Sequence, residues 1–250
     1  MSRVIAWFSC GDASAVAAQL AVEKYGDRCE VCYCDTFAYE HPDNRRFFAD
    51  VERWLGRPIK VLRSDEYSDI YDVFEKTRWL IGTKGARCTT ELKKNVRKAY
   101  QRPDDVHIFG FTADERHRVE NFYDENPELF ASFPLVDLGI TKRECHAIVR
   151  RAGIELPLMY RLGYRNNNCI GCVKGGTGYW NKIREDFPEI FAKMAAMERN
   201  LNAAICKKEG SVNGKRWRKR VFLDELEPNT GRYEAEPDIE CGVLCVQAAE

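Results

Sequence analysis

The first 22 residues constrain the fold more than any other stretch of this chain. Residues 4–8 form a short apolar run typical of a buried strand, and a loop with the sequence Ser-Cys-Gly-Asp-Ala-Ser follows at residues 9–14. The next residues, 15–22, are rich in alanine and predict a helix. A strand, a small-residue loop and a helix N-terminus bring backbone N–H groups and the positive end of the helix dipole to one point. The sequence therefore predicts a phosphate site here, although an ordinary strand-to-helix turn has the same pattern.

Apolar runs alternate with helical patterns over residues 29–153. The sequence predicts strands at 30–34, 58–62, 106–110 and 133–138, and helices near 42–55, 69–80, 91–100 and 141–153. This alternation indicates an α/β fold with a mainly parallel sheet. Ligands of such sheets bind outside the carboxyl ends of the strands. We therefore expect residues 9–14, Asp35-Thr36 and residues 110–118 to surround one crevice.

Near residue 156 the alternating strand and helix patterns give way to an irregular stretch rich in turn-forming residues. We expect a nucleotide-binding α/β domain over residues 1–155 and a helical and irregular, cysteine-bearing extension over residues 156–250. The extension includes a predicted helix from Pro188 to about Cys206. A basic segment around Trp217 follows: Lys207, Lys208, Lys215, Arg216, Arg218, Lys219 and Arg220. Cations neutralise phosphates and an aromatic ring stacks on bases, so this segment suits nucleic acid. From the residues alone, a solvated loop or a lid over the nucleotide is the preferred interpretation.

The composition bears on partners and location. The 39 lysines and arginines balance 39 aspartates and glutamates, so any basic patch must be local. No apolar run approaches the roughly 20 residues that span a bilayer. The apolar start also lacks the basic leader of a secretory signal. We therefore expect a cytoplasmic protein that does not contact a membrane.

Eleven cysteines are unusual for a chain of this kind and favour metal ligands or redox thiols over disulfides. Cys169 and Cys172 have the spacing at which two thiolates on a turn bind one metal or iron centre. Cys88, Cys241 and Cys245 supply further thiols, enough for a tetrathiolate site with one to spare. The residues distinguish neither zinc from a four-iron, four-sulfur cluster nor a metal site from a redox pair.

Four cations fall in or next to loops expected on the crevice side of the sheet: Arg87, Lys93, Arg116 and Arg118. A guanidinium fork binds sulfate or phosphate oxygens in pairs, and a lysine adds a point charge. Glu115 lies in the same loop as two of the arginines and is placed to orient one of them. Their convergence beside a phosphate loop predicts an anionic substrate.

Six short motifs occur in order along the chain: the loop Ser9–Ser14; Asp35-Thr36 followed by Pro42; Arg87-Cys88 followed by Lys93; Gly110, Glu115 and Arg118; Leu158 to Cys172; and Glu240-Cys241-Gly242. Together they resemble the phosphoadenosine phosphosulfate (PAPS) reductase branch of the adenine nucleotide alpha hydrolase, or PP-loop, superfamily. The similarity covers residues 3–175, and the match in the tail is separate and weaker.

The resemblance implies a Rossmann-like fold with a crevice for an adenine nucleotide, either ATP or an adenylyl sulfate. It assigns nucleotide or phosphate binding to Ser9, Cys10, Gly11, Asp12, Ala13, Ser14, Asp35, Thr36, Arg87, Gly110, Arg116 and Arg118. It makes Cys241 the nucleophile, assisted by Lys93 and Glu115. Attack of this cysteine on the sulfate sulfur would give a thiosulfonate, from which a thioredoxin-type thiol would then release sulfite. The metal ligands implied are Cys88, Cys169, Cys172 and Cys245, with Cys241 as an alternative fourth ligand.

Two departures from the family pattern bear on the chemistry. The adjacent cysteine pair of the family is Cys88-Thr89 here, which leaves three irons of a cluster with protein ligands unless a tail cysteine completes the set. Ala13 replaces the aspartate of ATP-cleaving PP-loop enzymes, which favours the reductase, although the adjacent Asp12 is a partial substitute. Two alternatives stay open: an ATP-dependent sulfurtransferase that modifies DNA or tRNA, with a sulfur donor as a partner, and a nucleotide-binding zinc protein without turnover.

Overall fold

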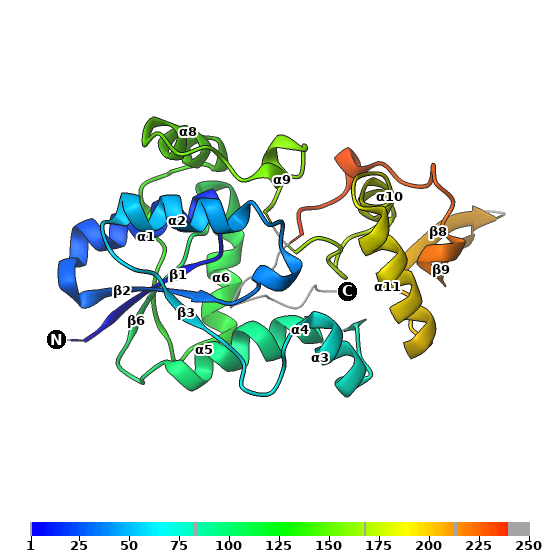
Figure 1. The fold of residues 1–250 in the computed structure, drawn as a ribbon, viewed down its shortest axis with the longest axis horizontal. Helices are drawn as coiled ribbons and strands as arrows, with labels where there is room; N and C mark the ends of the chain where they lie inside the picture. Colours follow the sequence, from blue (N-terminus) through cyan, green and yellow to red (C-terminus); the bar gives the residue numbers. More distant parts are fainter. Residues whose placement is uncertain (1, 83–84, 168, 213–214, 240–250) are drawn as a thin grey trace.

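A five-stranded parallel sheet forms the centre of the protein, in the order β3-β2-β1-β6-β7. The computed structural model describes residues 2–82, 85–167, 169–212 and 215–239 of the 250-residue chain. Figure 1 shows helices α1 and α2 on one side of the sheet and α5 on the other. The strands are β1 (Val4–Phe8), β2 (Cys29–Cys34), β3 (Lys60–Leu62), β6 (Val106–Ile108) and β7 (Phe130–Ser132). This arrangement confirms the predicted α/β fold with a mainly parallel sheet.

Among the described residues, no helix is both long enough and apolar enough to cross a bilayer.

The α-helices are α1 (Asp12–Tyr25), α2 (Asn44–Leu55), α3 (Ile70–Thr77), α4 (Arg87–Thr89), α5 (Asn95–Tyr100), α6 (Arg116–Glu125), α7 (Pro134–Asp137), α8 (Lys142–Arg151), α9 (Leu158–Arg161), α10 (Thr177–Asp186) and α11 (Pro188–Leu201). A π-helical stretch, Thr90–Lys94, joins α4 to α5. Two short antiparallel pairs complete the fold: β4 (Ile81–Gly82) with β5 (Gly85–Ala86), and β8 (Cys206–Val212) with β9 (Lys215–Val221). Single 3₁₀ turns lie at Gly26–Arg28, Phe37–Tyr39, Ala113–Glu115, Leu223–Glu225 and Tyr233–Ala235.

Strand β1 explains why the chain begins with an uninterrupted apolar run. Successive side chains of a strand point to opposite faces, so a strand covered on both faces is apolar throughout. Val4, Ala6 and Phe8 pack with residues of α1, α2 and α8. Ile5 and Trp7 pack on the other face with residues of α5 and α6. At β1 both faces of the sheet are therefore buried.

A third apolar cluster joins the extension to the rest of the chain. It combines residues of α3 and the region of α4 with residues of α10, α11 and the 169–173 turn. Figure 1 shows α10, α11 and the β8–β9 pair grouped at the right of the picture, apart from the helices that cover the two faces of the sheet. The extension therefore has its own packed core, which also includes helical segments from the first part of the chain.

Two predicted elements are wrong. The strand predicted at 133–138 is helix α7, and the strand that precedes it is β7. Pro134 accounts for this, because proline suits the first turn of a helix and has no N–H to donate to a strand ladder. The helix predicted to reach Cys206 ends at Leu201, where Asn202 adopts a left-handed φ of 50°, and Cys206 begins strand β8 instead. The helix predicted at 141–153 is α8, and a capping box between Thr141 and Glu144 opens it.

His107 is a buried imidazole in the middle of the sheet. It stacks between Trp7 and Phe109, and the Trp7 indole Nε1 donates to its Nδ1 at 3.0 Å. Burial, assisted by the charge of Arg97, lowers the pKa of His107 to about 4. The folded protein therefore binds fewer protons than the unfolded chain between pH 6.5 and 4. Stability contributed by the neutral imidazole is lost as the pH falls through this window.

The substitution His107→Phe tests this contribution. We expect the free energy of unfolding of the variant, measured in urea at pH 7 and pH 4.5, to fall less on acidification than that of the wild type. His117→Phe is the control, because His117 is exposed on α6 and should leave the pH dependence unchanged. Equal pH dependence in the wild type and His107→Phe would contradict the argument.

Candidate functional site

A cavity of about 560 Å³ opens at the carboxyl ends of β1, β2 and β6. This is the edge of the sheet at which the sequence predicts a crevice. The lining draws on loops of the sheet and on the extension. It consists of Trp7, Phe8, Ser9, Gly11, Ala13, Ser14, Tyr33, Cys34, Thr36, Lys93, Phe109, Gly110, Phe111, Thr112, Asp114, Glu115, Arg118, Lys142, His146, Tyr160, Arg165, Asn166, Asn167, Asp238 and Ile239.

The loop before α1 is held closed by the Ser14 hydroxyl. Its Oγ accepts a hydrogen bond from the Ser9 backbone N–H at 3.1 Å and donates to the Gly11 carbonyl at 2.9 Å. Cys10 adopts a left-handed φ of 54°, a strained conformation for a residue other than glycine. Among the described residues, no side chain caps the N-terminus of α1. The first turn of α1 therefore presents backbone N–H groups and the positive end of its dipole at the cavity.

Arg118 reaches the cavity as part of a rigid unit. Its guanidinium carbon lies 4.1 Å from the centre of the Phe111 ring, and it forms an ion pair with Glu115. The other Glu115 oxygen accepts from the Thr112 backbone N–H at 3.0 Å, which completes a capping box. Glu115 thus orients Arg118, as the sequence suggests. The predicted catalytic role of Glu115 stays a prediction.

Several residues predicted to bind phosphate lie outside the cavity lining. Asp35 accepts from the Arg63 Nε at 2.8 Å, and the Arg87 guanidinium pairs with Glu91 at 2.7 Å. Arg116 donates to the Val136 carbonyl at 3.3 Å. Cys10 and Asp12 are buried behind the loop. The remaining predicted residues do line the cavity: Ser9, Gly11, Ala13, Ser14, Thr36, Gly110 and Arg118, together with Lys93 and Glu115.

Asp12 belongs to a polar cluster that the sequence did not reveal. Its carboxylate is fully buried, pairs with the Lys142 ammonium, and accepts from the Tyr160 hydroxyl at 2.8 Å. The His146 Nε2 lies 3.2 Å from its second oxygen. Burial alone would lower the pKa of Lys142, but Tyr160 and Asp12 outweigh this effect and raise it above its usual value. Lys142 therefore stays charged at the cavity wall, whereas burial lowers the pKa of His146 and favours the neutral imidazole.

A chain of amide hydrogen bonds links the loop to the extension. The Asn167 side-chain amide donates to the Cys10 carbonyl at 2.6 Å and to the Asn44 side-chain oxygen at 2.8 Å. Asn44 in turn donates to Glu40 at 2.7 Å. Burial raises the pKa of Glu40, and Lys93 partly offsets this effect. Asn167 thus fixes the segment that leads into Cys169 against the strained residue of the phosphate loop.

The 169–172 turn is fixed by a buried tyrosine. Gly171 has a left-handed φ of 75°, which places Cys169 and Cys172 on one tight turn. The Tyr179 hydroxyl accepts from the Cys172 backbone N–H at 2.9 Å and donates to the Cys169 carbonyl at 3.2 Å. Burial, followed by the nearby Cys172, raises the pKa of Tyr179 well above its usual value, so the hydroxyl keeps its proton and both hydrogen bonds.

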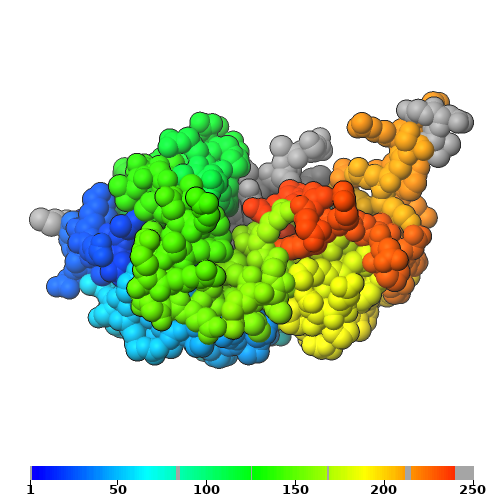
Figure 2. All heavy atoms as spheres, turned by 90° about the horizontal axis from the view of Figure 1, so that it is seen from above, coloured from blue at the N-terminus to red at the C-terminus, as the bar shows by residue number. Residues whose placement is uncertain are grey.

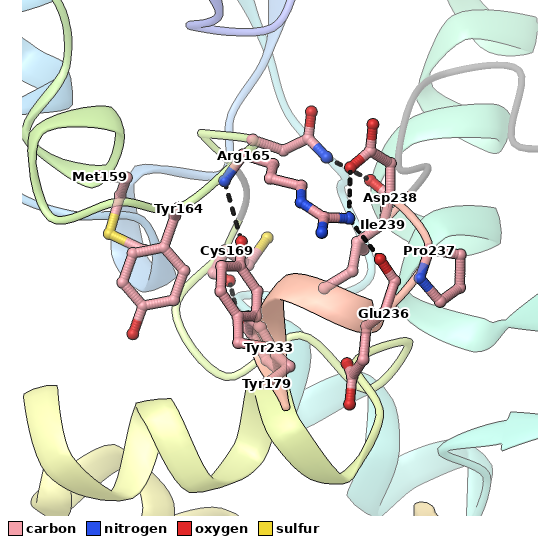
Figure 3. Close-up of a pocket in the computed structure, with 11 residues that line it drawn as sticks. Met159, Tyr164, Arg165, Cys169, Tyr179, Tyr233, Glu236, Pro237, Asp238 and Ile239 are labelled. Carbon is pink, nitrogen blue, oxygen red and sulfur yellow. Dashed lines mark hydrogen bonds and ion pairs between the residues drawn. The ribbon is translucent and has the colours of Figure 1, made fainter. Parts of the chain in front are cut away.

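Arg165 holds the segment 233–239 beside this turn (Figure 3). The Arg165 backbone N–H donates to the Tyr233 hydroxyl at 2.8 Å, and its guanidinium contacts Asp238 at 3.3 Å. Cys169 and Ile239 both line a small pocket of about 10 Å³, room for one water molecule. Ile239 also lines the large cavity. The end of the segment 233–239 therefore lies at the wall of the candidate site.

The three predicted metal ligands that the structure describes share one environment. Cys169 and Cys172 are buried in the third apolar cluster, and Cys88 packs against it. Within residues 2–82, 85–167, 169–212 and 215–239, no three histidine, cysteine, aspartate or glutamate side chains form a group that would hold a metal ion. Cys241 and Cys245 lie outside the described residues. The metal site stays a prediction.

The comparisons with known proteins assign neither a family nor a role to this site. The chain matches neither a model of a known protein family nor a curated protein sequence. Three polar residues of the cavity lining that the sequence did not indicate are Lys142, His146 and Tyr160, which reach the cavity from α8 and α9. Their local sequence carries no sign of this position, because tertiary packing of α8 on α1 creates it.

Proposed function

We propose that the cavity binds an adenine nucleotide with its phosphate groups at the N-terminus of α1. The observation that supports this most strongly is the convergence of Lys93, Arg118 and Lys142 on a cavity that also receives the uncapped first turn of that helix. These three cations come from separate segments of the chain, so no single local cause accounts for their meeting. Fixed donors of this kind favour phosphate or sulfate oxygens.

The remainder of the lining suits the base and sugar. The volume of about 560 Å³ lies within the usual range for small-molecule sites. Phe8, Tyr33 and Phe109 add aromatic surface on the strand side of the cavity. A cavity lined by both cations and aromatic rings matches a nucleotide better than it matches inorganic phosphate. This supports membership of the PAPS reductase-like branch of the PP-loop superfamily, the family that the sequence motifs resemble.

Within that proposal, Cys241 is the nucleophile toward an adenylyl sulfate. Its thiolate attacks the sulfate sulfur, an S–S bond forms, and the S–O bond to the nucleotide phosphate breaks, so the nucleotide leaves with its phosphate oxygen. A thiol of a thioredoxin-type reductant then attacks the Cys241 sulfur, forms a disulfide and releases sulfite. Ile239 lines the cavity, and two residues span at most about 7 Å, which is consistent with this assignment. Lys93 and Arg118 would hold the sulfate and lower the pKa of an approaching thiol.

The thiol ligands fit a soft metal or an iron–sulfur cluster in kind. Cys88, Cys169 and Cys172 share one apolar cluster, and Cys169 lies at the pocket that Ile239 also lines. These residues, with Cys245, would hold the group. When bound, it would cross-link the 169–172 turn to α4 and supply a redox-active centre near the cavity.

An ATP-dependent sulfurtransferase acting on DNA or tRNA is the second candidate. The observation that favours it is the exposed basic β8–β9 pair, which carries seven lysines and arginines. Ala13, which lines the cavity in place of an acidic residue, favours the reductase instead. A nucleotide-binding zinc protein without turnover is the third candidate.

The substitution Cys241→Ser tests the reductase proposal. We expect sulfite release from adenylyl sulfate or PAPS, measured with thioredoxin as reductant, to fall at least about a thousandfold because serine is a far weaker nucleophile at neutral pH. Binding of the nucleotide, measured by calorimetry, should persist. Cys206→Ala is the control, because Cys206 is a buried thiol outside the cavity lining and should keep full activity.

Three measurements separate the alternatives. Retention of sulfite release by Cys241→Ser would exclude Cys241 as the nucleophile. Pyrophosphate or AMP release from ATP that requires added DNA or RNA would replace the reductase by the sulfurtransferase. A colourless, anaerobically purified protein with one equivalent of zinc would exclude the iron–sulfur cluster, whereas a visible absorption band with matching iron content would support it.

A further inference from the structure

The β8–β9 hairpin is a charged arm separate from the candidate nucleotide site. Figure 2 shows it extending from the side of the molecule, and none of its described residues lines the 560 Å³ cavity. Strand β9 is exposed from Lys215 to Arg220. Across residues 206–221, seven lysines and arginines stand against one glutamate. This position does not support a lid over the nucleotide.

The strand register sorts the cations onto two faces. Because side chains alternate along a strand, Trp217 shares one face with Lys208, Lys215 and Lys219. The other face carries a second set: Lys207, Arg216, Arg218 and Arg220. Each face of the ribbon is therefore positive, and the aromatic ring lies among the lysines.

Pairing across the hairpin places like charges directly opposite each other. Lys207 is the partner of Arg220, and Lys208 is the partner of Lys219. Such like-charge pairs destabilise a sheet. Burial lowers the pKa of Lys207, and the nearby charges of Arg218 and Arg220 lower it further. Lys208 pairs with Glu227 at 2.9 Å, and Arg218 pairs with Glu209 at 2.7 Å. The cations Lys207, Lys215, Arg216 and Lys219 form no ion pair with any residue that the structure describes.

Trp217 is held flat against the opposite strand. Its cross-strand partner is Gly210, and a Cβ at that position would lie only 2.4 Å from the Trp217 Cζ2. The absence of a side chain at Gly210 therefore lets the indole lie over the β8 backbone. The residue is still 42% exposed. A large ring fixed on one side and open on the other, between lysines, is a platform for a stacked base.

We propose that the β8–β9 hairpin binds single-stranded nucleic acid on the face that carries Trp217, with an unpaired base stacked on that ring and phosphates at Lys215 and Lys219. The unrelieved charge provides attraction for a polyanion, and the ring selects unpaired bases over paired ones, whose faces are already stacked. The surface lies outside the cavity, so this inference does not depend on the reaction that the cavity carries out.

The test is fluorescence anisotropy with a fluorescein-labelled 20-nucleotide strand, as DNA and as RNA, and with the DNA duplex of the same sequence. We expect both single strands to bind more tightly than the duplex. Trp217→Ala should weaken single-strand binding about tenfold or more, and Trp217→Phe should restore part of the loss. Trp79→Ala is the matched control, because Trp79 is an exposed tryptophan (47%) elsewhere on the surface.

A charge variant tests the phosphate contacts without altering the ring. Each contact contributes about 0.7 to the slope of log K against log salt for single strands, so Lys215→Ala/Lys219→Ala should reduce that slope by about 1.4. The control Lys98→Ala/Arg102→Ala removes the same charge from exposed residues near the amino end of β6 and should leave the slope unchanged.

Four results would overturn the inference: no binding of any strand at low salt, tighter binding of the duplex, equal losses in the control variants, or binding of vesicles rich in phosphatidylserine without binding of the strands. Different affinities for the DNA and RNA strands would identify the source of the ligand. Because the assay needs no nucleotide or reductant, failure of the proposed cavity function would leave its outcome unchanged.

Discussion

Gly110→Ala is expected to lower the free energy of unfolding by about 1–3 kcal/mol and to weaken adenine nucleotide binding about tenfold or more. Gly110 follows β6 where the chain passes directly over the first turn of α1. A Cβ at this position would lie 2.7 Å from the Ser14 Cα, 2.8 Å from the Ser14 N and 2.9 Å from the Ala13 carbonyl carbon. These are backbone atoms and cannot rotate away. The start of α1 must therefore shift, and the N–H groups that face the cavity must shift with it.

Gly11→Ala is the matched control for this prediction. Gly11 has an ordinary φ of −105°, and the nearest atom to a Cβ there is the Tyr160 hydroxyl oxygen at 3.4 Å. Urea unfolding should show a loss of no more than about 1 kcal/mol for Gly11→Ala, because the added Cβ meets no clash and the loss is limited to replacing glycine by alanine, a poorer N-cap. Calorimetric titration with AMP or ATP then measures the second effect for Gly110→Ala. Equal stability of the two variants would contradict the close approach of β6 to α1.

The part of the site that lies close together in sequence was predictable. Residues 4–14 encode a strand, a loop and a helix start through local pattern, and the structure places all three where expected. Thr36 and Gly110 follow because every parallel strand ends at the same edge of the sheet. These predictions need only the direction of the chain at the end of each strand, which the pattern of apolar residues supplies.

Side-chain direction and long-range packing were not predictable in the same way. Arg87 and Arg116 lie in the expected segments, yet each is engaged away from the cavity, by Glu91 and by the Val136 carbonyl. Lys142 reaches the cavity although it is 130 residues from its partner Asp12. Spacing along the chain determines which face of an element a residue occupies, and it does not reveal which partner another element brings there.

The β8–β9 hairpin illustrates a different limit. Most of the ribbon is exposed on both of its faces, and charged residues occupy both faces. Its strands therefore lack the alternation of apolar and polar residues that marks a half-buried strand. Without that alternation, the sequence reads as a solvated loop. The hairpin is instead fixed at its base, where the buried Glu198 accepts from the Leu223 backbone N–H at 2.6 Å and from that of Ile205.

Lys142→Met is expected to lower the free energy of unfolding by about 3 kcal/mol, the lower end of the range for breaking a buried ion pair. The Asp12 carboxylate is fully buried, whereas the Lys142 side chain is 33% exposed, which moderates the loss. Without the ammonium, Asp12 keeps only the Tyr160 hydroxyl and the neutral His146 as neighbours among the residues that contact it. A buried charge would then stand uncompensated at the foot of the phosphate loop.

The double variant Asp12→Asn/Lys142→Met separates charge from packing. Removing both charges avoids the uncompensated carboxylate, so the double variant should be more stable in urea than Lys142→Met alone, with a favourable coupling of about 1–3 kcal/mol. Lys76→Met is the surface control, because its pair with Asp72 is 52% and 23% exposed and should contribute less than about 1 kcal/mol. If Lys142→Met were no less stable than Lys76→Met, the buried Asp12–Lys142 ion pair would contribute no more to the free energy of unfolding than the exposed surface pair, which would contradict the argument.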